Sequence, residues 1–212
     1  MPPTTGILDD FNRADQTGLG ASWSANAFTN YPSFNIASNA ASNAAAAFRS
    51  NYWSSAFDAD QEFYCTLGAA ANAFYLLARL VNPGAAPTAY QVLFEATGGV
   101  AHIQKMVAGT TTQLGANVSL TAAAGDGILL RVEGSTISLH HKPSGGSWSE
   151  VATRTDTAIT AGGFAGFLLN NNTTTFTLDD AGGGSLPQPV RPGTSNRRLM
   201  SRRRTRRRRS YA

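Results

Sequence analysis

The sequence has one cysteine, few charged residues and no long apolar run. Cys65 is alone among 212 residues, so no disulfide can form within the chain and the fold must be held by packing. Charged residues make up only 14%, against about 25% in an average soluble domain. No apolar segment approaches the roughly 18 residues of a membrane-spanning helix. Residues 1–6 also lack the basic and apolar regions of a secretory signal. We therefore expect neither a disulfide scaffold nor a membrane span.

The charges that are present divide the chain into two regions. Residues 1–190 carry seven Lys or Arg against thirteen Asp or Glu, which makes this body mildly acidic. Residues 191–212 carry ten Arg and no acidic residue. This asymmetry indicates a polyanion or an acidic protein as the partner of the tail.

The body is predicted to consist of about a dozen short strands. Gly, Asn, Ser and Pro interrupt it at short intervals, and helical periodicity is absent. In the segment 73–81, alternate residues from Phe74 to Leu80 are expected on one face and those from Tyr75 to Val81 on the other. The Ala-rich stretch 37–47 is expected to be loop and short strand, because polar residues interrupt it. The predicted strands cover 61–69, 73–81, 89–95, 100–107, 127–133, 136–142, 164–169 and 174–179. Such a series is typical of an antiparallel sandwich or barrel.

The composition changes at Gly182-Gly183-Gly184, and prolines follow at 187, 189 and 192. Proline cannot join a central strand, so residues 182–196 are predicted to form a Gly/Pro-rich linker. Residues 197–212 cannot bury their charge and are predicted to be a disordered basic tail when free.

Three segments resemble, in order and spacing, a concanavalin A-like or laminin-G-like domain of bacteriophage and bacterial surface proteins. The first is Leu8-Asp9-Asp10-Phe11-Asn12-Arg13, followed by Gly18-Leu19-Gly20 and Trp23. The second is Gly125-Asp126-Gly127-Ile128-Leu129-Leu130-Arg131-Val132-Glu133-Gly134, and the third is Gly163-Phe164-Ala165-Gly166-Phe167 with Phe176-Thr177-Leu178-Asp179-Asp180. The resemblance implies an all-β, two-sheet jelly roll over residues 1–181, in which the first and last strands pair. Fold alone does not give function.

Some relatives of this fold hydrolyse glycans, which normally requires two flanking carboxylates. Asp58, Asp60 and Glu62 alternate and can share a strand face, but the Glu-x-Asp-x-x-Glu pattern of the glucanase branch is absent. We expect these acids to form an exposed strand entry and the protein not to be an enzyme. A divergent glycan hydrolase that uses Asp60 or Glu62 is the alternative.

Two further groups in the body are candidates for binding. Asp10 and Asp179 are candidate Ca²⁺ ligands, because Ca²⁺ takes six to eight oxygen ligands and the paired end strands bring these acids together. The competing interpretation is that they cap strand ends. Tyr52, Trp53 and Trp148 are candidate sugar contacts, since aromatic rings offer a flat apolar body. Trp23 is expected in the core.

The tail is the strongest functional signal. Guanidinium groups bind phosphate or carboxylate in a bidentate manner and stack on bases. Contacts to packaged or free nucleic acid, docking on an acidic protein surface, and a plain localisation or solubilising role are all open. The candidate contact residues are Arg197, Arg198, Arg202, Arg203, Arg204, Arg206, Arg207, Arg208 and Arg209.

These features together predict a non-catalytic structural protein of a bacteriophage virion, such as a capsid decoration, fibre or tail-associated protein. Its sandwich would be displayed or packed in a multi-copy assembly with other virion proteins, and its tail would anchor it. The alternative from another class is a carbohydrate-binding module that adheres to host surface glycans.

Overall fold

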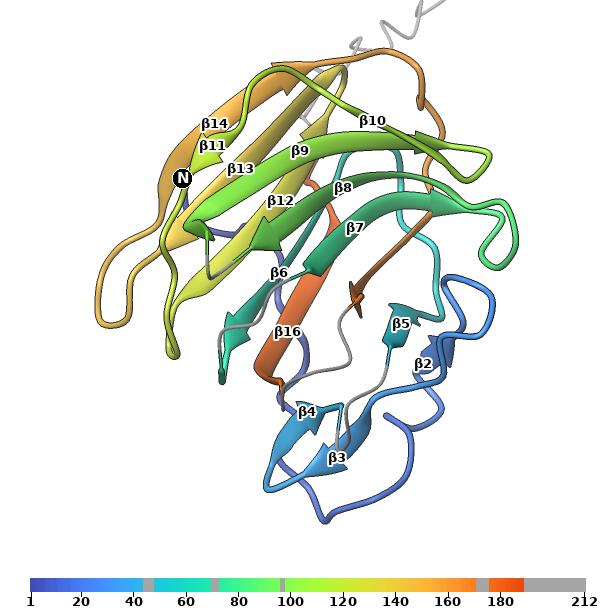
Figure 1. Ribbon diagram of the computed structural model, residues 1–212, viewed down its shortest axis with the longest axis vertical. Helices are drawn as coiled ribbons and strands as arrows, with labels where there is room; N and C mark the ends of the chain where they lie inside the picture. The colour runs from blue at the N-terminus through green and yellow to red at the C-terminus, as the bar shows by residue number, and fades with distance from the viewer. Residues whose placement is uncertain (44–47, 70–72, 96–97, 171–175, 189–212) are drawn as a thin grey trace, which may run out of the picture.

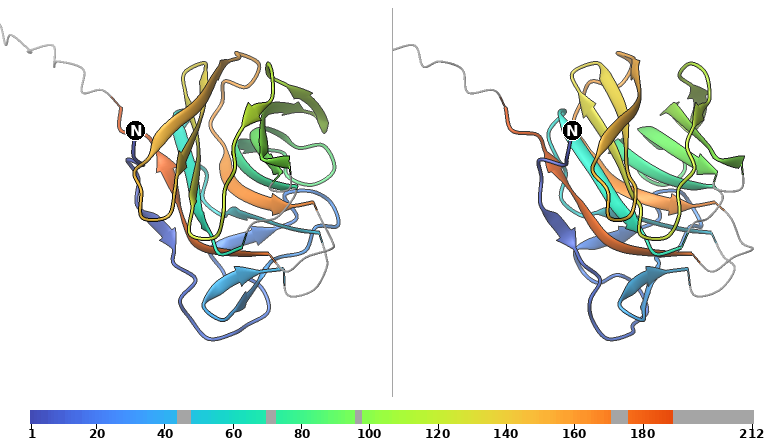
Figure 2. Two further views of the ribbon diagram at one scale, coloured as in Figure 1. Left: turned by 60° about the vertical axis from the view of Figure 1, so that its left-hand side comes forward. Right: turned by 90° about the vertical axis from the view of Figure 1, so that its left-hand side faces the viewer.

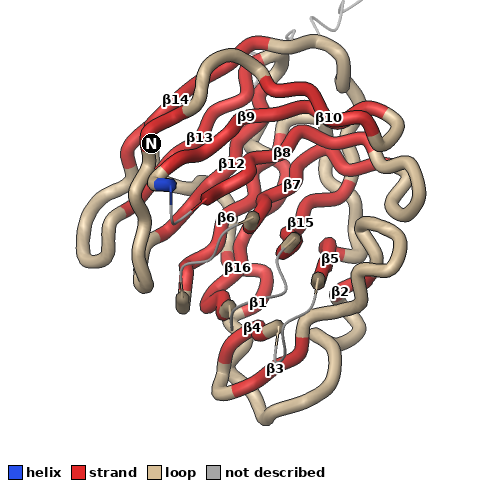
Figure 3. Tube along the Cα trace, viewed as in Figure 1, coloured by secondary structure: helices blue, strands red, loops and turns tan. Residues whose placement is uncertain are grey.

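The computed structural model describes residues 1–43, 48–69, 73–95, 98–170 and 176–188. Strands and turns account for nearly all of this part of the chain (Figure 3). The strands form two antiparallel sheets that pack face to face (Figures 1 and 2). The predicted all-β, two-sheet concanavalin A-like sandwich is therefore confirmed.

The first sheet, here called sheet A, has eight strands. These are β1 (Ile7–Asp9), β3 (Asn35–Ala37), β4 (Ala40–Ser42), β6 (Gln61–Leu67), β12 (Gly127–Glu133), β13 (Thr136–Lys142), β14 (Ser149–Thr155) and β16 (Thr177–Ser185). Their order is β14-β13-β12-β6-β16-β4-β3, and β1 pairs with β16 beside β4.

The second sheet, sheet B, also has eight strands. These are β2 (Trp23–Ala25), β5 (Arg49–Trp53), β7 (Phe74–Val81), β8 (Thr88–Glu95), β9 (Val100–Val107), β10 (Thr110–Gln113), β11 (Val118–Ser119) and β15 (Phe164–Leu169). Their order is β10-β9-β8-β7-β15-β5-β2, and β11 pairs with β9. The long curved strands β7, β8 and β9 lie side by side in Figure 1.

The core lies between the sheets and is built by period-two alternation. Phe63 and Cys65 of β6 and Tyr90 and Phe94 of β8 point inward and are at most 1% exposed. Trp23 joins them at 6% exposed, as expected, and meets Phe167 edge to face with ring centroids 5.3 Å apart. Burial strongly raises the pKa of the Cys65 thiol, so this cysteine is a core residue and stays protonated.

The predicted alternation along residues 73–81 is wrong at its end. The segment from Phe74 to Ala78 alternates as expected, but Arg79 has a φ of 51° and the pairing with β8 shifts between Ala78 and Val81. This bulge turns Leu80 to the outer face of sheet B, where it packs in a cluster with Leu77 and Leu168. The buried Arg79 side chain instead donates hydrogen bonds to backbone carbonyls, among them that of Gly134 at 2.8 Å.

The end strands meet as the resemblance implied, but the sandwich extends beyond the predicted boundary. Ile7 pairs with Gly182 and Asp9 with Ala181. The strand β16 then continues through Ser185, so Gly182-Gly183-Gly184 belongs to sheet A and not to a linker. Leu186, only 8% exposed, follows it. Position 182 needs a glycine because the ring of Tyr64 in β6 lies directly over it and leaves no room for a Cβ atom.

The two ends of the described chain lie side by side (Figure 2). Met1, Leu186 and Pro187 line one shared pocket on sheet A. None of the described residues forms a helix that is long and apolar enough to cross a membrane. The predicted tail, from Arg197 onward, lies outside the described residues.

Candidate functional site

The outer face of sheet B carries a group of aromatic and amide side chains. Alternation along β7, β8 and β9 turns Tyr75, Gln91 and Met106 away from the core and toward the side of sheet B seen in Figure 1. The segment 26–31 crosses this face and is held there by a hydrogen bond from the Thr29 amide to the Gly84 carbonyl, at 3.1 Å. Distant parts of the chain thereby form one surface.

Three rings, those of Phe28, Tyr31 and Phe48, form an aromatic wall on this surface. Tyr31 packs against Phe28 with ring centroids 5.7 Å apart, and it stacks on Phe48 at 5.4 Å with an interplanar angle of 23°. Phe48 is 41% exposed, whereas most large apolar side chains of the described residues are buried or half-buried. Asn170 anchors this wall, because the Tyr31 hydroxyl donates to its Oδ1 at 2.8 Å. Tyr75 and Asn170 both line the neighbouring hollow. Burial raises the pKa values of both tyrosines, so both rings stay neutral.

A hollow of about 130 Å³ lies beside this wall. A buried water molecule occupies about 30 Å³, so the hollow is large enough for a substituent of a sugar ring but not for a whole oligosaccharide. None of its lining residues carries a formal charge. They are Phe28, Tyr31, Tyr75, Gln91, Met106, Thr111, Leu168 and Asn170.

A row of polar side chains continues from the hollow across β8, β9 and β10. The Nε2 atom of Gln91 donates to Oε1 of Gln104 at 2.8 Å. Farther along, the two ring nitrogens of His102 lie 3.2 Å from a carboxylate oxygen of Glu95 and 3.1 Å from Oε1 of Gln113. The surface therefore offers apolar rings next to hydrogen-bonding groups, which is the composition that a sugar requires.

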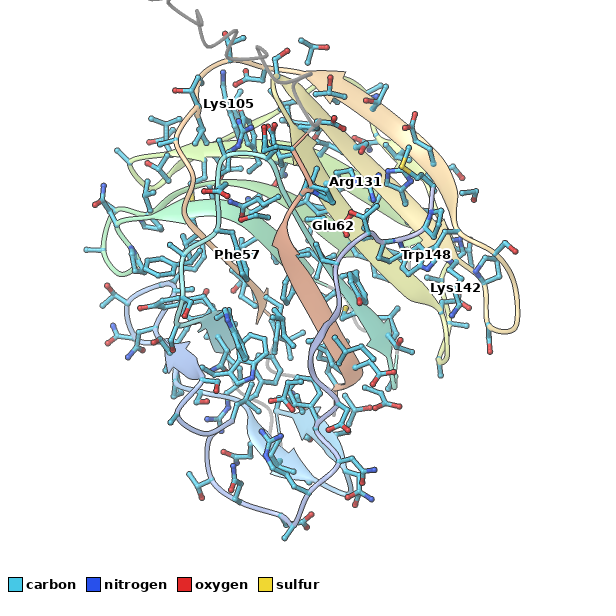
Figure 4. The ribbon with its side chains drawn as sticks, turned by 180° about the vertical axis from the view of Figure 1, so that it is seen from behind. Phe57, Glu62, Lys105, Arg131, Lys142 and Trp148 are labelled. Atoms are coloured by element: carbon cyan, nitrogen blue, oxygen red, sulfur yellow. The ribbon has the colours of Figure 1, made fainter. Side chains whose placement is uncertain are left out.

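The sugar contacts predicted from the sequence do not form one platform. Tyr52 lies on the outer face of sheet B, against Phe164 at 5.0 Å, while Trp53 turns toward the core and meets Trp23 at 5.3 Å. Trp148 lies on the opposite side of the molecule, over Gly127 of sheet A, with its ring 6.2 Å from that of Tyr64 (Figure 4). The structure thus separates the three residues onto different surfaces.

The predicted calcium ligands do lie together. Asp10 and Asp179 line a pocket of about 530 Å³, with Asp180 and the polar side chains of Asn12 and Asn39. Burial and then the charges of Asp179 and Asp10 raise the pKa of Asp180, as expected for carboxylates that repel one another. Among the described residues, no group of three or more His, Cys, Asp or Glu side chains is arranged to hold a metal. Calcium binding therefore stays a prediction.

The alternative hydrolase pair is engaged in structural contacts. Glu62 is fully buried on the outer face of sheet A and accepts a hydrogen bond from Arg131 Nε at 2.8 Å (Figure 4). Asp60 accepts a hydrogen bond from the Gly134 amide at 2.7 Å. Burial would raise the pKa of Glu62, but hydrogen bonds from Arg131, Thr4 and Thr5 and the charge of Arg131 hold that pKa below the usual value of a glutamate. A glycosidase acid needs the opposite shift.

Tyr31, Tyr75 and Gln91 were not among the site residues predicted from the sequence. Tyr75 and Gln91 occupy outward positions of strands whose ranges were predicted, so their period-two positions were a usable signal. Tyr31 lies in a loop, and only the tertiary structure places it beside them.

No protein-family model matches the sequence, and no curated protein matches it. Solved structures match by fold. The carbohydrate-binding module CBM66 from Bacillus subtilis matches with a TM-score of 0.56 and 11% identity, over 79% of this chain and 98% of that one. The exoplasmic/lumenal domain of VIP36 in its Ca²⁺/Man-bound form has a TM-score of 0.55 and 8% identity, over 82% of each chain.

Two other kinds of protein share the fold. The CBM2 module of the evolved Dit of Lactobacillus casei BL23 phage J-1 has a TM-score of 0.50 and 12% identity, over 82% of this chain and 92% of that one. A xylan β-1,4-xylosidase from Bacillus halodurans also matches, with a TM-score of 0.52 and 15% identity, but the chain covers only 40% of that enzyme. At these identities the matches establish the concanavalin A-like sandwich fold and nothing finer.

Proposed function

We propose that this protein is a carbohydrate-binding module that holds a neutral glycan on the outer face of sheet B. One observation carries the proposal: an aromatic wall, an uncharged hollow and a row of amide side chains lie side by side on that face. The fold it shares with a carbohydrate-binding module and with a Ca²⁺/Man-bound domain supports the proposal.

The chemistry of a sugar matches the two halves of the site. The C–H faces of a pyranose ring are apolar and pack on flat aromatic rings such as Tyr31 and Phe48. Its hydroxyl groups both donate and accept, as do the amides of Gln104 and Asn170. No cationic side chain of the described residues lines the hollow, so a neutral sugar fits better than an anionic one.

We also propose that the protein binds without cleaving. Glu62 is fixed by Arg131, and Asp60 by the amide of Gly134. Neither carboxylate lies on the face that carries the hollow, so a glycan bound there would be out of their reach.

A glycan array probed with the full chain tests the function, followed by calorimetric titration of the best ligand. We expect saturable binding to a neutral glycan. Tyr31→Ala is expected to weaken it roughly tenfold or more, because a tyrosine at the centre of an interface typically contributes more than about 1.4 kcal/mol.

Trp148→Ala is the matched control, since it removes a partly exposed aromatic ring from the opposite face. It should leave affinity unchanged. Absence of binding across the array would overturn the function. Loss of binding in Trp148→Ala but not in Tyr31→Ala would move the site to sheet A.

A second proposal concerns the tail and the location of the protein. We infer that the module is a virion component of a bacteriophage, held by its arginines to nucleic acid or to an acidic protein surface. The ten Arg of residues 191–212 against the acidic body support a tether, and the fold shared with a module of a phage Dit supports a virion. Neighbouring virion proteins and further copies of this chain are then its expected partners.

The tether can be tested with the full chain and a chain that ends at Gln188. Both are titrated with duplex DNA and with purified virion shells across a salt series. Binding of DNA by the full chain alone, falling steeply with salt, is the expected result. Equal binding of shells by both chains would assign assembly to the sandwich and overturn the tether.

A further inference from the structure

We propose that the hollow on sheet B receives an acetamido group, so that the module selects 2-acetamido sugars over the matching hexoses. This inference rests on the proposed glycan-binding function and names the ligand class of the same site. Its basis is the pairing of apolar walls with one buried acceptor that has no donor.

The walls of the hollow favour a methyl group. Phe28, Tyr75, Met106 and Leu168 contribute apolar surface to it, and Met106 and Leu168 are 1% and 3% exposed. A hydroxyl group placed against these side chains would lose its bonds to water and find few partners. A methyl group loses nothing of that kind and gains contact with all four walls.

The acceptor is Oε1 of Gln91. This residue is only 3% exposed, and among the described residues its Oε1 has no hydrogen-bond partner. The other end of the same amide is engaged, because Nε2 donates to Gln104 at 2.8 Å. Buried acceptors are rarely left unpaired, so an orphan acceptor on a residue that lines the hollow points to a donor that the ligand brings.

An acetamido group supplies both features on one edge. Its amide is planar and trans, so the N–H lies opposite the carbonyl oxygen. The methyl group is bonded to the carbonyl carbon and lies on the same side of the C–N bond as the N–H. The methyl group and the N–H therefore share one edge of the acetamido group. A single substituent can thus place its methyl against Met106 while its N–H donates to Gln91. The remaining carbonyl can accept from Thr111 or Asn170, which also line the hollow.

Other common sugar substituents match either the apolar walls or the Gln91 acceptor, but not both. A hexose hydroxyl could donate to Gln91 but would leave the apolar walls uncovered. A free amine or a carboxylate would bring a charge into a space whose lining has no countercharge. The acetamido group is the one that fits both the walls and the acceptor.

The test uses the full chain and three pairs of methyl glycosides, of gluco, galacto and manno configuration. Each pair contains a hexose and its 2-acetamido counterpart, and dissociation constants are measured by NMR titration. We expect at least one acetamido sugar to bind tenfold or more tightly than its hexose. Saturation transfer should then be strongest at the acetyl methyl.

Variants locate the selectivity. Gln91→Leu removes the acceptor and is expected to reduce the preference for the acetamido sugar over its hexose to less than threefold. Gln188→Leu is the control, because it removes an amide that bonds Asp60, away from the face that carries the hollow, and it should retain the preference. The ligand pairs alone decide the question on the unmodified chain if Gln91→Leu does not fold.

The possible outcomes distinguish a failure of the acetamido selectivity from a failure of the proposed glycan-binding function. Equal binding of hexose and acetamido sugar in all three pairs would overturn the acetamido selectivity and leave the glycan-binding function intact. No binding of any monosaccharide or array glycan would overturn both. A preference that survives in Gln91→Leu would overturn the role of its Oε1.

Discussion

Glu62 of β6 and Arg131 of β12 face each other on the outer surface of sheet A, where both are at most 5% exposed (Figure 4). Arg131 donates from Nε and Nη2 to one carboxylate oxygen, Oε2. The other oxygen, Oε1, accepts from the amides of Thr4 and Thr5 at 2.6 and 2.8 Å. The N-terminal segment thus covers an ion pair that belongs to the sheet, and every oxygen of the pair is satisfied.

Removing one partner of this ion pair should be costly. Glu62→Ala leaves the buried Arg131 charge without a countercharge, and we expect it to lower the free energy of unfolding by about 3–5 kcal/mol. Glu133→Ala, an exposed acid on the same strand as Arg131, should change it by less than about 0.5 kcal/mol. Urea denaturation measures both. A Glu62→Met, Arg131→Met double variant should recover most of the loss, and equal effects of the two single Ala variants would contradict the assignment.

The glycines of β16 are required by their neighbours. A Cβ at Gly182 would lie 2.1 Å from the Tyr64 ring, which cannot be accommodated without displacing it. Gly182→Ala should therefore destabilise the protein by about 1–3 kcal/mol. Gly6→Ala is the control, because no atom lies within 4 Å of its Cβ position. A linker would tolerate both changes, so equal melting temperatures of the two variants would argue against the strand.

The same glycines mark the limit of what the sequence could predict. Strands such as 127–133 and 136–142 were predicted to the residue, because alternating apolar residues report which face is buried. Residues 182–184 resemble a linker in sequence. The reason for their glycines is the Tyr64 ring, which packs on Gly182 from more than a hundred positions earlier and leaves no signal in the local sequence. The bulge at Arg79 is likewise fixed by long-range carbonyl contacts and has no local signal.

In the candidate site, too, the sequence predicts the orientation of strand residues but not the contacts between distant segments. Gln91 and Tyr75 occupy the outward positions of predicted strands, so the sequence contained their orientation. The hollow also needs the Tyr31 loop and Asn170, which come from opposite ends of the chain and meet through one hydrogen bond. The aromatics chosen from the sequence were separated because Trp53 and Tyr52 are neighbours on one strand and must point to opposite faces.

Asp9 should be more important for stability than its neighbour Asp10. Its carboxylate accepts from the indole Nε1 of Trp23 at 2.8 Å and from both terminal nitrogens of Arg13. Asp9→Ala leaves the Trp23 N–H without a partner, and we expect a loss of about 2–3 kcal/mol. Asp10 is exposed and accepts only from the Asn12 amide within the described chain, so Asp10→Ala should cost less than about 1 kcal/mol. Chemical denaturation followed by tryptophan fluorescence compares them, and similar losses would refute the distinction.

His140 should make the folded state sensitive to mild acid. It is 2% exposed, and its Nδ1 has no hydrogen-bond partner among the described residues. Burial, followed by the positive charges of the amino terminus and Arg131, lowers its pKa from 6.5 to about 4, although Glu62 opposes the shift. Ser138, at 3.0 Å from Nε2, is its hydrogen-bonding neighbour.

The sign of the effect follows from proton linkage. Between about pH 4 and 6.5 the unfolded chain binds a proton at residue 140 that the folded chain does not, so stability increases with pH across this window. The contribution is fully present above pH 6.5 and is lost as the pH falls. We expect about 2 kcal/mol of stability to disappear between pH 7 and pH 5. The carboxylates with lowered pKa values act below this interval, so they do not obscure it. His140→Gln should remove this histidine's share of the slope in denaturation curves recorded at each pH. An NMR titration in which the His140 ring protonates near pH 6.5 would show that the imidazole is not held neutral by its burial.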